Sequence, residues 1–356
     1  MKVAHFGRFT PNASGQFESI KDMMVGEKAV GIEPAFIDCG SDKDDASVCY
    51  VHMEDDGLHV VDPKWALDAD IFVRHSIIPP SLEKLGKPTV MMLHGRPENS
   101  FLLEHYEKTP VYSLVAQKLH PLSYKAFVTY WNEFIFNWEF IVSRNKLFSI
   151  PSAVNLDKYT VEGKTHQFGE LSGSPNIVIV DVWREDVTPY NVLHATALFK
   201  EKYAPNAKIH IFGLPSNEKS AFVTLIESFC RKGVIGQAYT LFKGLERVYR
   251  AADIVVTPHN MATRIVRESL ACGTPVVAGT GCSYTPYTAD SRHYPSFAKA
   301  INDCWQTACI SSEVQSTASR VMAEKCFNPK EQGRQIKRIF DKLLITNKSN
   351  KMRFWR

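Results

Sequence analysis

Short apolar runs alternate with segments of helical spacing along most of the chain. In the first half, the pattern predicts strands at residues 3–6, 33–37, 70–74, 88–93, 127–130 and 146–150, and a helix over 17–30. The runs are rich in β-branched and aromatic residues and end at Gly, Pro or polar turn residues. Strands that alternate with helices in this way are typical of a parallel sheet covered by helices on both faces.

The same pattern starts again in the second half. It predicts strands at 176–181, 208–212 and 239–242, helices near 191–203 and 218–232, and a last repeat over 251–278. A chain of 356 residues with 44% hydrophobic content is long enough for two cores. We therefore expect two Rossmann-like, doubly wound α/β domains that meet within the segment Pro151–Tyr159, the first over 1–156 and the second over 157–334.

The last repeat carries the clearest candidate site. A β-branched run over 253–257 ends at Pro258, residues 265–271 have helical spacing, and Gly273 and Pro275 precede a final apolar run. A loop that leads from a strand into a helix presents free backbone N–H groups, which suit phosphate. The helix start carries the candidate phosphate-binding residues Arg264, Ile265, Val266 and Arg267. Glu268 follows one turn into the helix, where its carboxylate can accept hydrogen bonds from a ribose diol.

The run Glu268-Ser-Leu-Ala-Cys-Gly-Thr-Pro-Val-Val-Ala278 resembles the nucleotide-sugar site of the retaining glycosyltransferases of family four. The motif of that family has a first Glu, seven residues and a second Glu, which matches Glu268. The first Glu falls on Asn260. In the family that carboxylate faces the hydroxyls of the donor sugar, whereas an amide supplies hydrogen bonds without negative charge. We therefore expect a changed rate or donor preference.

The resemblance implies the two-Rossmann-domain architecture called GT-B, with a cleft between the domains. The first domain would bind the acceptor and the second the donor. In the family a C-terminal helix crosses back onto the first domain. Residues 335–356 are the candidate here, because five residues recur at three- and four-residue spacing and form one apolar face: Ile336, Ile339, Phe340, Leu343 and Leu344.

Further candidates lie in the first domain. Gly15 follows the first predicted strand and matches the first-loop glycine of the family, so a ligand could approach its backbone closely. His94 ends a strand, where the family has a His-Gly, and would hydrogen-bond the donor sugar. His75 and Ser76 end the preceding strand on the acceptor side. Each of these residues could also be structural.

The family holds the donor diphosphate with an Arg and a Lys after the first strand of the second domain. Only Arg184 stands there in this sequence, and it could instead pair with Glu185 or Asp186. Lys243, Arg264 and Arg267 are further cations. Together they could neutralise a diphosphate without a metal, so we expect no metal and no cofactor besides the nucleotide-diphosphate sugar itself. No strong general base is apparent, and the resemblance implies that the departing phosphate accepts the acceptor's proton, with retention.

Composition adds a charge asymmetry. The net charge is +4, but residues 325–356 hold ten Lys or Arg against Glu331 and Asp341, with Phe354 and Trp355 near the end. Such a tail could contact an anionic membrane or nucleic acid, or form a solvated helix face. The eight cysteines lack Cys-x-x-Cys spacing and are expected to be free, buried thiols. The sequence shows neither a signal peptide nor an apolar run of about 18 residues, so we expect a cytoplasmic protein. Its basic tail could still contact a membrane surface.

The favoured function is transfer of a sugar from a nucleotide-diphosphate sugar, with UDP as the expected nucleotide. The acceptor stays open among a glycan, a lipid-linked glycan, a protein and a nucleic acid. Two alternatives share the fold. One is a sugar-nucleotide epimerase or hydrolase, and the other is a catalytically impaired nucleotide-sugar-binding protein, which Asn260 and the missing Lys near Arg184 would favour.

Overall fold

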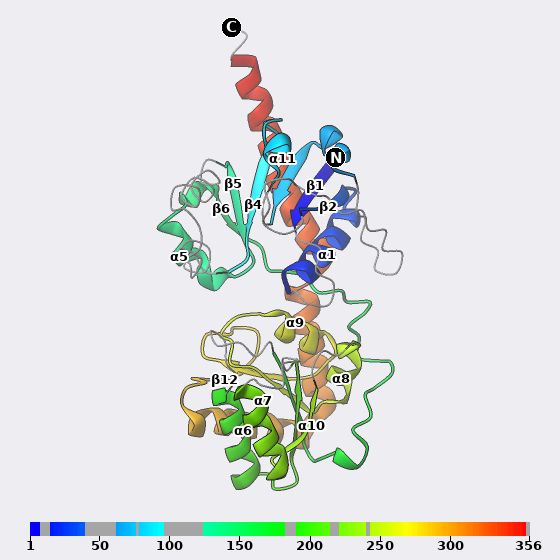
Figure 1. Cartoon of the computed structure of the whole chain (residues 1–356), viewed down its shortest axis with the longest axis vertical. Coiled ribbons are helices and arrows are strands. Elements are labelled where there is room, and N and C mark those ends of the chain that lie inside the picture. The colour runs from blue at the N-terminus through cyan, green and yellow to red at the C-terminus, as the bar shows by residue number, and fades with distance from the viewer. Residues whose placement is uncertain are drawn as a thin grey trace. The chain divides into compact units, whose positions relative to one another are not determined.

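The structure is a computed structural model that describes residues 1–7, 15–39, 62–75, 78–95, 124–181, 190–213, 221–239 and 243–353 (Figure 1). The chain divides into two compact units. The N-terminal unit holds Met1–Ala153 together with Phe327–Arg356, and the C-terminal unit holds Val154–Cys326. The first division lies within the Pro151–Tyr159 segment, whereas the second lies ahead of the expected position at 334/335. The acceptor and donor roles of the two units stay predictions.

The N-terminal unit is built on a six-stranded parallel sheet in the order β2-β1-β3-β4-β5-β6. Its strands are β1 Lys2–Gly7, β2 Glu33–Asp38, β3 Ile71–Arg74, β4 Thr89–Leu93, β5 Ala126–Thr129 and β6 Leu147–Ser149. All six lie within two residues of the predicted strands. Chain order reverses beside β1, which gives the doubly wound arrangement that the alternation predicts.

Helices cover this sheet. They are α1 Gly15–Lys28, α2 Pro80–Glu83, α5 Ile135–Glu139 and α11 Pro329–Arg353, with 3-10 turns at Pro63–Asp68, Asn132–Phe134 and Arg144–Lys146. On one face, α1 and α11 pack against Val3, Val73 and Met92 of the sheet. The predicted apolar face of α11 is confirmed, since its Ile336, Ile339, Phe340 and Leu343 are buried in this core and Leu344 packs against it. The C-terminal helix therefore returns to the N-terminal unit.

Two glycines allow α1 and α11 to touch through their backbones. A Cβ atom on Gly26 would lie 2.1 Å from the carbonyl oxygen of Pro329, and one on Gly333 would lie 2.1 Å from the carbonyl oxygen of Gly26. No side chain fits at these distances. The close crossing holds α11 beside α1, while its C-terminal turns extend beyond the sheet (Figure 1).

The C-terminal unit is built on a second six-stranded parallel sheet, in the order β12-β11-β10-β7-β8-β9. Its strands are β7 Asn176–Val180, β8 Lys208–Phe212, β9 Ile235–Tyr239, β10 Ile254–Val256, β11 Val276–Gly279 and β12 Tyr287–Ala289. Its helices are α6 Tyr190–Lys202, α7 Ala221–Arg231, α8 Leu245–Ala251, α9 Arg264–Ala271 and α10 Tyr294–Cys326, with a 3-10 turn at Gly169–Leu171. The fold class, two doubly wound α/β domains, is confirmed.

Two differences from the sequence prediction concern this unit. The described strand β9, Ile235–Tyr239, begins four residues before the predicted strand 239–242, because the chain enters it directly after the turn at Gly233, whose φ is 68°; residues 240–242 lie outside the described residues. β12 and the long helix α10 were not predicted. The φ/ψ values of Ser311 are non-helical, so α10 is two helices joined at a kink. Residues 40–61, whose six Asp and Glu predict a surface segment, lie outside the described residues.

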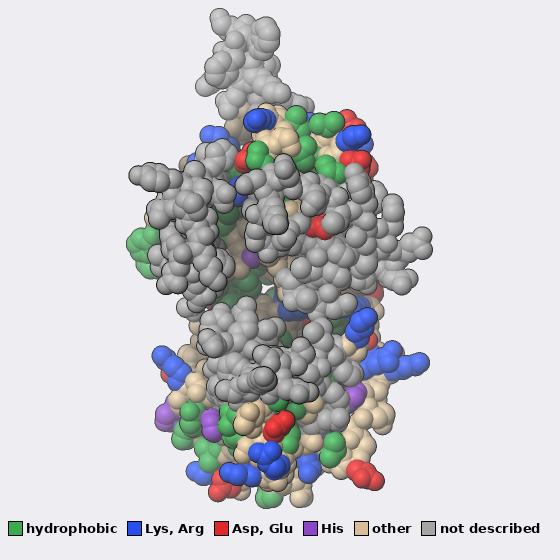
Figure 2. All heavy atoms as spheres, viewed as in Figure 1, with side chains coloured by type: hydrophobic (Ala, Val, Ile, Leu, Met, Phe, Trp, Pro, Cys, Tyr) green, Lys and Arg blue, Asp and Glu red, His purple; other side chains and the backbone are tan. Residues whose placement is uncertain are grey.

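Three further findings concern the side chains and helices that the structure describes. Seven cysteines are free; Cys272, Cys282 and Cys304 are buried, whereas Cys309 is exposed rather than buried as expected. No helix in the described part of the chain combines the length and apolar character needed to cross a membrane. On the face shown in Figure 2, Lys and Arg side chains are interspersed with Asp and Glu.

Candidate functional site

The loop after β10 leads directly into α9, and the start of this helix has no side-chain cap. Thr263 is the N-cap residue of α9 and has extended backbone, but its hydroxyl makes no hydrogen bond to the helix. Within the described ranges, the first-turn N–H groups of α9 are therefore not satisfied by a cap. A helix start with free N–H groups carries a partial positive charge and suits an anion such as phosphate.

Glu268 lies one turn into α9 and is almost fully buried, with 2% of its surface exposed. Both of its carboxylate oxygens have protein partners. The Nε of Arg264 donates to Oε1, and the hydroxyl of Tyr249 donates to Oε2 at 3.3 Å. Arg264 also donates through Nη2 to the hydroxyl of Tyr159 at 3.3 Å. Because the carboxylate is almost fully buried, a ribose hydroxyl would reach it only if neighbouring side chains moved.

The two tyrosines around Glu268 stay protonated at neutral pH. Burial raises the pKa of the Tyr249 phenol well above its usual range, and the nearby Glu268 carboxylate raises it further. The pKa of Tyr159 is raised for the same two reasons. Arg320 of α10 donates to the carbonyl oxygens of Tyr159 and Ala271, each at 2.7 Å, and so ties the Tyr159 segment to the end of α9. The sequence reasoning did not identify Tyr159, Tyr249 or Arg320.

The other predicted donor-side residues fall into three groups. Asn260 lies partly exposed in the loop before α9, beside Gly281. On α9, Ile265 is partly exposed, while Val266 and Arg267 are buried. Lys243 is exposed and precedes Gly244, the N-cap residue of α8. Arg184 lies outside the described residues. The structure thus brings Arg264 and Glu268 into direct contact, and these assignments as ligand-binding residues stay predictions.

A second pair of polar residues lies at the carboxyl edge of the same sheet. Asp181 follows β7 and His259 follows β10, and these two strands are neighbours. Nε2 of His259 lies 3.1 Å from Oδ2 of Asp181. The N–H of Gly279 in β11 donates to the carbonyl oxygen of His259 at 2.8 Å, and this hydrogen bond fixes the loop that carries His259. The sequence signal for this pair was a polar residue shortly after each of two buried strands, since Asp181 directly follows β7 and His259 stands three residues beyond β10.

In the N-terminal unit, two predicted residues lie in direct contact. His75 follows β3, His94 follows β4, and their Nδ1 and Nε2 atoms are 2.9 Å apart. His75 also lies 3.0 Å from His5 of β1, whose other ring nitrogen lies 2.7 Å from a carboxylate oxygen of Glu27 on α1. His5 and Glu27 were not predicted. Ser76 lies outside the described residues.

Gly15 is the first residue of α1, and the predicted ligand loop before it, 8–14, is outside the described residues. The next residue, Gln16, donates through Nε2 to the carbonyl oxygen of His75 at 2.8 Å. A Cβ atom on Gly15 would meet no described atom within 4 Å. Packing inside the described part of the protein therefore does not require glycine at position 15.

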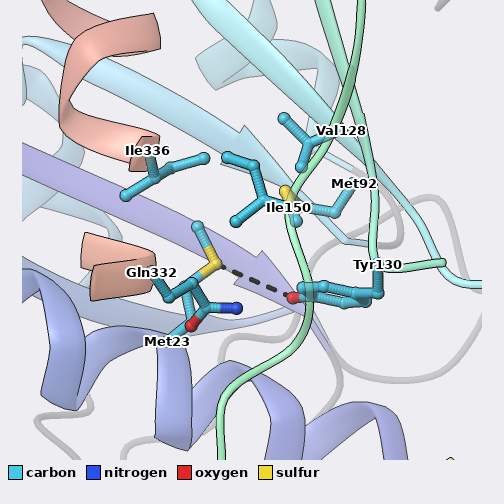
Figure 3. A pocket seen from close by; sticks show the side chains of 7 residues that line it. All are labelled: Met23, Met92, Val128, Tyr130, Ile150, Gln332 and Ile336. Carbon is cyan, nitrogen blue, oxygen red and sulfur yellow. Dashed lines mark hydrogen bonds between the residues drawn. The ribbon is translucent and has the colours of Figure 1, made fainter. Parts of the chain in front are cut away.

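A narrow crevice lies next to the histidines, between the sheet, α1 and α11 (Figure 3). The ring of Tyr130 packs edge-on against His94 with centroids 5.1 Å apart, and its hydroxyl lies 3.7 Å from Sδ of Met23. The crevice has no room for a water molecule, whereas ordinary ligand pockets enclose roughly 300–1,000 Å³. This crevice is a packing feature rather than a ligand site. Among the described side chains, no group of three or more His, Cys, Asp and Glu is arranged to hold a metal.

No protein-family model and no curated protein sequence matches this chain significantly. Solved structures do match. Sucrose-phosphate synthase from Thermosynechococcus elongatus superposes with a TM-score of 0.70 and 14% identity, over 97% of this chain and 100% of that one. Anabaena HepE in complex with UDP-glucose gives 0.67 and 12%, over 96% and 100%. A trehalose-6-phosphate structure from E. coli bound with UDP-2-fluoro glucose gives 0.67 and 12%, over 96% and 99%.

The chain has the GT-B fold. The matches span nearly the whole length of both chains, so both halves of the GT-B architecture are represented. At 12–14% identity the likeness shows the fold alone. The GT-B fold does not determine the reaction, which depends on the residues at the carboxyl edges of the two sheets.

Proposed function

We propose that the chain is a glycosyltransferase that uses a nucleotide-diphosphate sugar as donor. The observation that carries the proposal is the uncapped start of α9 with the Glu268 carboxylate one turn further on. A diphosphate suits the free N–H groups and a ribose diol suits a carboxylate. The complex of the structurally similar HepE with UDP-glucose supports UDP as the nucleotide.

Arg264 connects the two halves of this site. In the structure its guanidinium is paired with Glu268, and 27% of its side chain is exposed. In the proposed complex the guanidinium turns from the carboxylate to the donor diphosphate, and the ribose hydroxyls donate to Glu268 in its place. Each charged group thus exchanges one charge-assisted partner for another, so neither is left unpaired in a partly buried site.

The same groups would assist departure of the diphosphate. Negative charge develops on the leaving phosphate as the glycosidic bond breaks, and the α9 N-terminus and Arg264 stabilise that charge without a metal. We propose retention of configuration, as the resemblance to family four implies. Asn260 offers hydrogen bonds without charge to the donor sugar, which favours a slower reaction or an altered donor preference.

A second candidate function is a nucleotide-sugar-binding protein without turnover. It is favoured by Asn260 in place of a carboxylate and by the pairing of Glu268 with Arg264 and Tyr249. Incubation of the pure protein with UDP-glucose, UDP-galactose, UDP-N-acetylglucosamine, ADP-glucose and GDP-mannose separates the candidates. We expect at least one donor to raise the melting temperature, and free nucleoside diphosphate to appear only when an acceptor is added.

The other outcomes of this experiment are equally informative. Diphosphate release without an acceptor indicates a hydrolase, and conversion to another nucleotide sugar indicates an epimerase. Stabilisation without any release indicates the binding protein. If none of the donors binds at millimolar concentration, the proposed donor site is wrong. Acceptors to be tested are glycans, lipid-linked glycans, proteins and nucleic acids.

A further inference from the structure

Four polar side chains form one line of hydrogen bonds through the N-terminal unit. Oε2 of Glu27 lies 2.7 Å from Nε2 of His5, and Nδ1 of His5 lies 3.0 Å from Nε2 of His75. Nδ1 of His75 lies 2.9 Å from Nε2 of His94. The histidines come from β1 and from the ends of β3 and β4, which are successive strands in the sheet. Sheet order therefore aligns residues that are far apart in sequence.

This line runs from the carboxyl edge of the sheet into the interior. His5 and Glu27 have no exposed surface and His75 is 7% exposed, whereas His94 is partly exposed. Val3, on the same face of β1 as His5, belongs to the core that also contains Met23 of α1. Polar groups in such a core are costly unless they are hydrogen-bonded, so the order of donors and acceptors along the line is constrained.

The protonation states follow from this order. Burial lowers the pKa of His94 to about 3, and burial together with His94 and His5 lowers the pKa of His75 well below its usual value. At neutral pH each of these rings has one donor and one acceptor nitrogen. The Glu27 carboxylate can only accept, so Nε2 of His5 donates to it. With His5 neutral, His75 donates to His5 and His94 donates to His75, both through Nε2.

The remaining nitrogen, Nδ1 of His94, then carries a lone pair. It makes no hydrogen bond within the described part of the chain, and it belongs to the partly exposed histidine. If His5 were doubly protonated, both later bonds would reverse and Nδ1 of His94 would carry a proton. The line therefore has two states that differ by one proton, and His94 shows opposite hydrogen-bonding character in each.

We propose that Glu27, His5 and His75 act as a relay that prepares Nδ1 of His94 to accept the proton of the attacking hydroxyl group and carries this proton to His5, so that His94 takes the place of the departing phosphate as proton acceptor. This inference rests on the proposed glycosyl transfer, since it assigns His94 a hydroxyl substrate. Glu27, His5 and His75 are positioning residues, and His94 alone would touch the substrate.

The proton balance of the relay is closed. The hydroxyl proton binds Nδ1 of His94, the Nε2 proton of His94 moves to Nδ1 of His75, and the Nε2 proton of His75 moves to Nδ1 of His5. His5 becomes an imidazolium that still donates to Glu27. The hydroxyl oxygen forms the new bond to the sugar carbon as the diphosphate leaves. Positive charge thus rests beside a carboxylate, which stabilises it, rather than on His94, where burial disfavours it.

Other charged groups of this region have separate partners. Nη1 of Arg74, the residue before His75, lies 3.0 Å from the hydroxyl of Tyr124, which itself donates to Glu83. Tyr130 meets His94 with its ring edge. Among the described residues, Glu27 is therefore the acidic side chain that contacts the relay.

The test measures the tautomers directly in the full-length protein. With ¹⁵N-labelled histidine, long-range ¹H–¹⁵N NMR at pH 8 should show His5, His75 and His94 each protonated at Nε2. A proton on Nδ1 of His94 would overturn the proposal. In Glu27→Leu, which removes the acceptor, a population with Nδ1 of His94 protonated should appear, whereas Glu27→Gln keeps a carbonyl acceptor and the wild-type pattern. An unchanged His94 signal in Glu27→Leu also overturns it.

A kinetic arm tests the proton transfer. A neutral amide does not balance an imidazolium, so Glu27→Gln should lower kcat at least about tenfold while the KM for the donor stays unchanged. The matched control is Glu33→Gln, which removes an exposed carboxylate at the start of β2. A wild-type kcat in Glu27→Gln rejects the proton-carrying role. UDP binding and circular dichroism check folding. Because the tautomer pattern needs no turnover, it fails or holds independently of the proposed transfer.

Discussion

Arg264 and Glu268 lie one turn apart on α9, and the guanidinium of Arg264 donates to the buried carboxylate of Glu268. The two residues that the sequence assigned to diphosphate and ribose are therefore joined to each other in the protein without ligand. In the proposed donor complex the two side chains separate, so a substitution of either one should change donor binding.

Replacing Glu268 should weaken nucleotide binding. Glu268→Gln keeps the shape of the side chain but removes the charge that pairs with Arg264 and that would accept from a ribose diol. We expect the affinity for UDP, measured by titration calorimetry, to fall at least about tenfold, or about 1.4 kcal/mol. Asp303→Asn is the control, since it breaks an exposed pair with Lys299 of the same i,i+4 spacing. If Glu268→Gln binds UDP with wild-type affinity, Glu268 is not part of the donor site.

Two glycines of α1 should respond oppositely to alanine. A Cβ on Gly26 would lie 2.1 Å from the Pro329 carbonyl oxygen, so Gly26→Ala has to push α11 away. We expect a loss of about 1–3 kcal/mol in the free energy of unfolding. Gly15→Ala meets no described atom within 4 Å and should leave stability unchanged or slightly higher. Urea denaturation of both variants measures the difference, and equal stabilities would contradict the helix contact.

Gly15→Ala also tests the predicted ligand loop. Because its effect on folding should be small, a fall in donor affinity would come from the ligand's approach to the backbone at position 15. We expect the melting temperature without ligand to stay at the wild-type value and the stabilisation by UDP-glucose to decrease. Equal stabilisation of both proteins would show that residue 15 is not close to the donor.

Gly279→Ala should disturb the loop that precedes α9. A Cβ there would lie 2.5 Å from the carbonyl oxygen of Pro258 and 3.1 Å from the carbonyl carbon of His259. The loop that carries His259 and Asn260 would have to move, so we expect weaker UDP binding together with a loss of about 1–3 kcal/mol in stability. Thermal unfolding and calorimetry measure the two effects. Unchanged donor affinity would place the loop away from the ligand.

Acid should destabilise the fold before carboxylates titrate. The pKa of His94 is lowered to about 3 and that of His210 to about 4, and that of His75 is also lowered, in each case mainly by burial. The unfolded chain binds these protons near pH 6.5, whereas the folded protein does not. Their contribution is therefore complete above about pH 6.5 and is lost as the pH falls, by up to about 1.4 kcal/mol per pH unit for each histidine.

Scanning calorimetry between pH 7.5 and 5 measures this slope. We expect the melting temperature to fall steadily over that range, and His75→Gln to show a shallower dependence than the wild type. His293→Gln, which replaces an exposed histidine, should keep the wild-type slope. A melting temperature that stays constant down to pH 5 would contradict the neutral, buried state of these rings.

Deleting residues 347–356 should separate the basic tail from the fold. The apolar residues that anchor α11 end at Leu344, so the truncated protein should keep its melting temperature. The deletion removes four of the ten Lys and Arg in 325–356. We expect weaker binding to vesicles that contain anionic lipid, or to DNA, in sedimentation and gel-shift assays at low salt. If both proteins bind neither, the tail is a solvated helix end.

Local pattern determined most of the architecture. Several elements are specified by neighbouring residues alone. Examples are the β-branched runs of β1, β7 and β8 and the apolar spacing of Ile336 to Leu343 in α11. Their repetition specified two doubly wound sheets, since short-range periodicity is what separates strand from helix. β12 was not predicted because three residues are too few for a pattern, and α10 was not predicted although its buried Phe297, Ile301 and Cys304 recur at helical spacing. The start of β9 is set by the turn at Gly233.

The sequence also placed Arg264 and Glu268 on one helix and His75 and His94 at strand ends. It did not determine what these side chains contact. Only the tertiary structure shows that Arg264 and Tyr249 donate hydrogen bonds to Glu268. Only the tertiary structure shows that Glu27, His5, His75 and His94 form one line of hydrogen bonds. Hydrogen bonds between residues 19 to 70 positions apart depend on strand order and on the approach of α1 to the sheet, which no local periodicity encodes.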